Sequence, residues 1–168
     1  MAQLIIMIEK LSWREKFAAS LLLLIGIGFA VMQVMSILSS KANGYKADES
    51  VITIRRGELL SDLKTYLTIF LALVGSILLF RQKRWGWIIG LPMLLVYMFL
   101  SGFGVYSYIY GSVYDTTLVF LLIVFVALLL SFVFLVIPSA RRKYKVGKYT
   151  YLPTLVFLMA ICAMYFFL

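Results

Sequence analysis

Hydrophobic residues fall into five long runs along this chain, at positions 17–38, 63–80, 85–106, 116–137 and 151–168. Each run is 18 to 22 residues long, and short polar segments separate the runs. A hydrocarbon core about 30 Å thick needs about 20 residues of helix, because each residue advances the helix by about 1.5 Å. The pattern therefore predicts an all-α fold, in which residues 1–168 form a single membrane domain, a polytopic bundle of five transmembrane helices.

The polar segments between the runs are short, with one exception. Residues 39–62 are predicted to form the largest loop, with two short strands or an irregular cap around positions 51–54, where strand-forming residues cluster. Residues 4–16 place apolar side chains at helical spacing, which predicts a short interfacial helix or, alternatively, an extension of the first span. Asp62 and Asp115 each directly precede a span, where an N-cap carboxylate is expected.

The distribution of positive charge predicts an orientation. Eleven of the 16 lysines and arginines lie in the N-terminal arm and in the second and fourth loops, and the other five lie in or beside the first loop. Lysine and arginine in short loops stay on the cytoplasmic side of a membrane. We therefore expect the N-terminus to be cytoplasmic, and the C-terminus and the loop at 39–62 to be extracytoplasmic.

The fourth loop contains the densest basic run. We expect these side chains to contact anionic lipid headgroups on the cytoplasmic side, with docking of an acidic protein as the alternative. The residues concerned are Arg141, Arg142, Lys143, Lys145 and Lys148.

Composition excludes several classes of function. The chain is 64% hydrophobic and only 14% charged, and its net charge of +9 comes from residues beside apolar spans, which favours lipid over nucleic acid as the partner. The chain has no histidine and a single cysteine, Cys162, so zinc and iron–sulfur sites are excluded and no cofactor is expected. No span interior contains an ionisable acid or base, which removes the groups for a proton relay or a nucleophile–base pair. We do not expect an enzyme.

Small and polar residues form stripes on the first three spans. Apolar side chains gain little by leaving lipid for a neighbouring helix, so close helix contacts depend on small residues and hydrogen bonds. We therefore predict that spans one to three form the core, with span three at its centre and kinked at Pro92, while spans four and five face lipid or a partner. The candidate packing or pore-lining residues are Gln33, Thr68, Gly75, Gly86, Gly90, Tyr97 and Ser101.

These features lead to three functional hypotheses. The first is a small non-catalytic protein of the cytoplasmic (inner) membrane that acts through contacts, as an accessory, regulatory or immunity-type subunit bound to another membrane protein. The second is a small homo-oligomeric channel or membrane-permeabilising effector, in which the polar stripes line a pore between protomers. The third is a transporter with an uncharged polar path.

Overall fold

In the computed structural model, the chain is described over residues 12–42, 52–111 and 116–167. These residues contain no strand; their helices are α2 (Trp13–Ala42), α3 (Ile52–Phe80), α4 (Arg84–Tyr110), α5 (Thr116–Val136), the short α6 (Pro138–Lys143) and α7 (Lys148–Phe167). Five of them, all except α6, are long and apolar enough to cross a membrane. The predicted all-α bundle of five membrane-spanning helices is confirmed.

The first two helices are longer than the hydrophobic runs indicated. Helix α3 begins at Ile52, so the expected strand or irregular cap around residues 51–54 is wrong for residues 52–54, which are helical. Asp62 lies inside α3 and not at its N-cap, which corrects a second prediction. Strand propensity is weak and depends on neighbouring strands, whereas extending an existing helix by one residue costs little. Asp115 and residues 4–11 lie outside the described residues.

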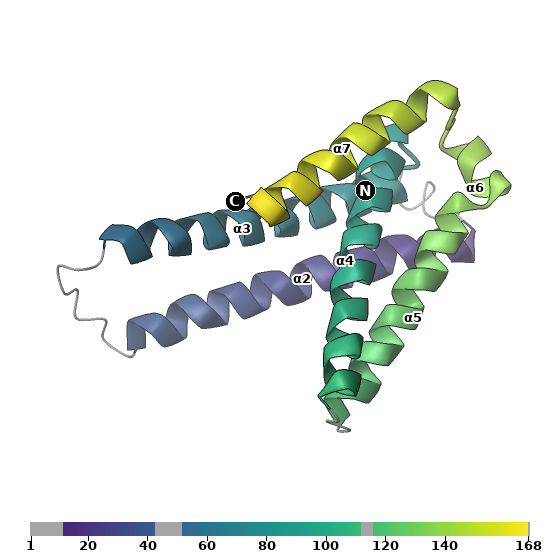
Figure 1. Ribbon diagram of the computed structural model, residues 1–168. Helices are drawn as coiled ribbons and strands as arrows, with labels where there is room; N and C mark the ends of the chain where they lie inside the picture. Colours follow the sequence, from purple (N-terminus) through teal and green to yellow (C-terminus); the bar gives the residue numbers. More distant parts are fainter. Residues whose placement is uncertain (1–11, 43–51, 112–115, 168) are drawn as a thin grey trace.

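The five long helices form two hairpins and one outer helix. Helices α2 and α3 form one hairpin and α4 and α5 the other; the hairpins meet at one end and diverge toward the other end (Figure 1). Helix α7 packs across α4, which also contacts α2, α3 and α5 (Figure 1). Helix α4 therefore lies at the centre of the molecule, and it continues through Pro92 without interruption.

Two helix ends are shaped by residues with positive φ. At the end of α3, the Lys83 amide donates to the Leu78 carbonyl and the Gln82 amide to the Leu79 carbonyl, with Gln82 at φ 52°. This is the hydrogen-bond pattern of a Schellman C-cap, in which glycine is the usual left-handed residue. Lys145, at φ 53°, ends α6 in the same way. The turn after α3 leads into α4, which packs against α3.

Helix α5 is part of the packed bundle in addition to the three spans predicted to form its core, although most of its surface is exposed. It packs against both α4 and α2, and it buries Leu128, Ser131 and Leu135. A Cβ atom added at Gly102 of α4 would lie 3.1 Å from the Phe125 ring. Large α5 side chains therefore fit against small α4 residues, so one small-residue helix is enough to make the contact close.

Candidate functional site

Three glycines bring α3 and α4 together. A Cβ atom at Gly86 would lie 2.4 Å from the backbone carbon of Leu78, so the two helix backbones are in direct contact there. A Cβ atom at Gly90 would lie 2.8 Å from the Leu79 side chain, and one at Gly75 would lie 3.5 Å from the backbone of Gly90. Gly75, Gly86 and Gly90 therefore act as a close-packing seam within one chain.

Two serine hydroxyl groups of the spans form hydrogen bonds between helices. Ser76 Oγ, on α3, donates a 2.9 Å hydrogen bond to the Ala19 carbonyl of α2. Ser101 Oγ, on α4, donates a 3.2 Å bond to the Leu121 carbonyl of α5. These bonds replace water for polar groups at membrane depth, where an unpaired group is costly.

Thr68 links α3 to the last helix. Its hydroxyl donates a 2.7 Å bond to the Lys64 carbonyl one turn earlier, and it lies 2.9 Å from the Tyr165 hydroxyl on α7. Like Ser101, Thr68 thus has its polar atom engaged inside the chain.

Tyr97 makes a contact between the two hairpins. The Tyr97 ring stacks on Phe29 of α2, with ring centroids 5.6 Å apart, and its hydroxyl is buried without a hydrogen-bond partner. Gln33, one turn beyond Phe29 on α2, is half-buried. The structure therefore brings Tyr97 to a contact between the two hairpins.

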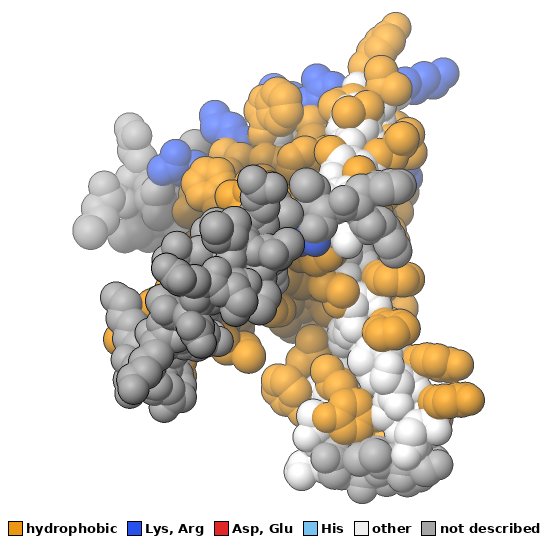
Figure 2. Space-filling model, turned by 60° about the vertical axis from the view of Figure 1, so that its left-hand side comes forward, with side chains coloured by type: hydrophobic (Ala, Val, Ile, Leu, Met, Phe, Trp, Pro, Cys, Tyr) orange, Lys and Arg blue, Asp and Glu red, His pale blue; other side chains and the backbone are white. Residues whose placement is uncertain are grey.

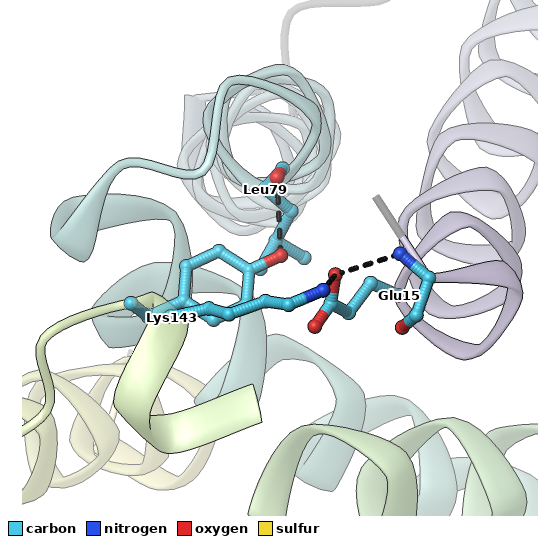
Figure 3. Close-up of polar contacts among 5 residues, drawn as sticks. Glu15, Leu79 and Lys143 are labelled. Carbon is cyan, nitrogen blue, oxygen red and sulfur yellow. Dashed lines mark hydrogen bonds and ion pairs between the residues drawn. The ribbon is translucent and has the colours of Figure 1, made fainter. Parts of the chain in front are cut away.

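A second polar cluster, which we call the polar junction, lies at the end where the hairpins meet. It comprises Glu15, Lys143, Tyr144 and the Leu79 carbonyl (Figure 3). Glu15 is only 2% exposed, and its Oε2 accepts bonds from Lys143 Nζ at 3.2 Å and from the Ser12 amide at 3.1 Å. A buried carboxylate is tolerated only when it is paired, and this pairing fixes α6 against the start of α2.

Tyr144 fixes the same segment to α3. Its ring is buried and its hydroxyl donates a 3.1 Å bond to the Leu79 carbonyl (Figure 3). Burial raises the pKa of Tyr144 above its usual range, and the nearby Glu15 carboxylate raises it further, because both disfavour a phenolate. The hydroxyl therefore remains a donor well into alkaline pH.

Arg141, which is also on α6, is held in place by contacts through the aromatic side chains of Tyr151 and Trp87. Its Nη1 donates a 2.7 Å bond to the Tyr151 hydroxyl, and the Tyr151 ring meets Trp87 edge to face at 5.8 Å. Trp87 is buried and donates from Nε1 to the Leu135 carbonyl at 3.0 Å. The guanidinium thus rests on groups supplied by α4, α5 and α7.

The structure separates the five residues of the basic run. Lys143 turns inward to Glu15 and Arg141 bonds Tyr151, whereas Arg142, Lys145 and Lys148 are exposed. Figure 2 shows most of the visible lysine and arginine side chains at this end of the molecule, and hydrophobic side chains along the two hairpins. The contact with anionic lipid headgroups stays a prediction.

Sequence analysis missed the polar junction. Glu15 lies within the basic N-terminal arm and Tyr144 within the fourth loop, and neither was predicted to form a contact. One signal was available: Glu15 is an acid that lies between Arg14 and Lys16 at the start of an apolar span, where a charge is expensive unless it is paired.

Among residues 12–42, 52–111 and 116–167, no group of three or more His, Cys, Asp or Glu side chains is placed to hold a metal ion. Comparison with known protein families, with curated proteins and with solved structures finds no match to this chain. The candidate site consists of the glycine seam, the interhelical hydroxyl bonds and the polar junction.

Proposed function

We propose that this chain is a small, non-catalytic multi-pass protein of the cytoplasmic membrane that acts as an accessory, regulatory or immunity-type subunit through contacts with another membrane protein. The observation that carries the proposal is how the polar groups of the spans are used. Ser76, Ser101 and Thr68 each bond a group of another helix in the same chain. Little polar chemistry is left to act on a substrate.

The remaining surface of the spans is apolar. On α5, large side chains such as Phe120 and Ile123 are 64% and 60% exposed, and on α2 Met32 is 68% exposed. Such surfaces suit lipid or the spans of a partner. The interhelical hydrogen bonds favour a rigid bundle, and the exposed apolar side chains are available to contact the spans of a partner.

Site-specific photocrosslinking in the native membrane tests the proposal. A photoreactive residue is placed at Met32, Phe120 or Leu152, which are exposed on α2, α5 and α7, and at the buried Leu128 as a control. We expect an adduct with one discrete partner from at least one exposed position and none from Leu128. Adducts that differ from the chain only by multiples of 19.2 kDa would indicate self-association and contradict the accessory-subunit proposal.

The second candidate is an oligomeric channel, which the unpartnered Tyr97 hydroxyl favours. A buried hydroxyl without a partner is costly at membrane depth, and water in a pore could satisfy it. Two of the other residues that would line such a path, Thr68 and Ser101, already bond groups within the chain. The contact protein is therefore the preferred proposal, and a leakage assay described below tests the channel.

A further inference from the structure

The Arg141 side chain carries hydrogen-bonding capacity that the chain itself does not use. A guanidinium has five N–H donors and is always charged. One bond from Nη1 reaches Tyr151, and Nε is buried without a partner among the described residues. The terminal N–H groups beyond the one bonded to Tyr151 can donate to an acceptor from outside the chain, and an oxyanion such as a phosphate, which can accept two bonds from the planar guanidinium fork, matches them best.

The position of the guanidinium is fixed in advance. Tyr151 holds it through the 2.7 Å bond, Trp87 packs against the Tyr151 ring, and Trp87 is in turn bonded to the Leu135 carbonyl. Restricting a long arginine side chain before a ligand arrives reduces the entropy lost on binding. The Arg141 guanidinium therefore resembles part of a preorganised binding site more than a flexible surface charge.

The charge around Arg141 selects for an anion. The segment from 141 to 148 contains five basic residues, and Glu15 pairs with one of them, Lys143. The other four, Arg141, Arg142, Lys145 and Lys148, make no ion pair with any acid in the described part of the chain. A zwitterionic headgroup would leave this excess uncompensated, whereas an anionic one would reduce it.

An exposed apolar stripe on α7 continues from the same point. Tyr151, Leu155 and Met159 are spaced four residues apart, so they lie on one face of the helix, and all three are exposed. The stripe extends about 12 Å from Tyr151 along the span, at about 1.5 Å per residue. An anion at Arg141 joined to an acyl chain along this stripe matches the arrangement of a phospholipid, and a free phosphate or an acidic protein would leave the stripe unused.

We propose that Arg141, Tyr151 and the α7 stripe form a binding site for one anionic glycerophospholipid, whose phosphate meets the Arg141 guanidinium and whose acyl chain follows Leu155 and Met159. The proposal rests on the membrane placement of the helices and is independent of any protein partner. The lipid would also bridge α7 and α6, and α6 is the segment that the polar junction fixes to α2 and α3.

Lipid retention tests the site. The full chain is reconstituted in nanodiscs of equimolar phosphatidylglycerol and phosphatidylcholine, extracted into mild detergent, and its retained lipid is measured by mass spectrometry. We expect retained lipid to be enriched in phosphatidylglycerol. Arg141→Gln should reduce that enrichment by more than about tenfold, because it removes charge-assisted hydrogen bonds in addition to the general attraction of one basic residue to an anionic surface, which alone is worth about fivefold. Lys83→Gln is the matched control, because it removes the same charge from the same end outside the site.

Two further variants separate positioning from charge. Tyr151→Phe keeps every charge and should reduce the enrichment because the guanidinium loses its support, while Arg141→Lys should reduce it because the fork is lost. If Arg141→Gln fails to fold, these two variants decide the question. Equal losses for Arg141→Gln and Lys83→Gln, unchanged enrichment in Tyr151→Phe, or no enrichment in the unaltered protein would overturn the proposal.

Discussion

The Nζ atom of Lys143 lies 3.2 Å from Oε2 of Glu15, and this ion pair joins residues 128 positions apart in the chain. Its two partners differ in their access to solvent: the Lys143 side chain is 39% exposed and that of Glu15 only 3%. If the pair is broken, the lysine can regain water, but the carboxylate cannot. The pair should therefore respond differently to loss of each partner.

We expect Lys143→Met to destabilise the protein by about 3 kcal/mol, the lower end for leaving a buried charge unpaired. Glu15→Gln should cost less, about 1 kcal/mol, because it removes the buried charge and retains an amide that can bond Ser12 and Lys143. Thermal or denaturant unfolding in detergent micelles measures both. Arg142→Met, at an exposed neighbouring position, should change stability by less than about 0.5 kcal/mol. Equal costs for the two partners would contradict this account of the pair.

The glycine seam gives a graded prediction. Alanine at Gly86 would place Cβ against the α3 backbone, which cannot move aside, so we expect a loss of about 3 kcal/mol. Alanine at Gly90 meets the end of the flexible Leu79 side chain and should cost about 1 kcal/mol. Gly28 has nothing within 4 Å of the added atom, so Gly28→Ala should be neutral or stabilising by up to about 1 kcal/mol.

Unfolding midpoints of the three variants, measured in one detergent, test this order. A cost at Gly28 as large as that at Gly86 would show that glycine is needed for a reason other than close helix contact.

The raised pKa of Tyr144 predicts that its contribution to folding stability decreases at alkaline pH. Its pKa is raised in the folded protein, so its contribution to stability is complete below the unfolded value of about 10 and is lost as pH rises through the folded value. Tyr144→Phe removes the bond to the Leu79 carbonyl and should cost about 1 kcal/mol at pH 8. The difference between variant and unaltered protein should shrink above about pH 10, where only the unaltered protein has this group to titrate. Unfolding midpoints at pH 8 and pH 11 check this; a constant difference would contradict it.

The helices could be predicted from sequence because the length and hydropathy of an apolar run are enough to identify a membrane span. Their ends could not. Gln82 and Lys145 take the left-handed position at which glycine is the usual signal, so nothing in the sequence marked these turns. The helical extension of α3 to Ile52 was missed because its first residues favour strands in isolation.

The small residues of the seam were also predictable, because their spacing on one helix face is a local property. The partners were not. Whether Ser76 bonds Ala19, or Lys143 reaches Glu15, depends on the arrangement of helices that are distant in sequence. Helix α5 illustrates the limit: its own sequence has almost no small residues, and it packs closely because Gly102 and Gly104 lie on the helix opposite.

Topology is a separate prediction, which the eleven-to-five division of basic residues supports. A reporter fused after Leu168 should behave as extracytoplasmic, and one inserted between Lys145 and Lys148 as cytoplasmic. Paired phosphatase and fluorescent-protein fusions at both positions provide the measurement. A cytoplasmic reporter after Leu168 would mean that α7 does not cross the membrane or that the whole arrangement is inverted.

The last prediction separates a contact protein from a pore, and it concerns Gln33. On the proposed function, replacing Gln33 with Leu should cost about 1 kcal/mol or less, as polar contacts within membranes do, and liposomes that contain the unaltered protein should retain ions and dye. On the channel hypothesis, the same change would narrow and dry a constriction, and would alter leakage far more than stability.

Purified protein in liposomes at several protein densities, with Gln33→Leu alongside, distinguishes the two hypotheses. Leakage that the substitution abolishes without changing the unfolding midpoint would favour the channel and count against the accessory subunit. Tight liposomes at every density would support the contact protein, because Thr68 and Ser101, two of the residues available to line a path, already bond other helices of the same chain.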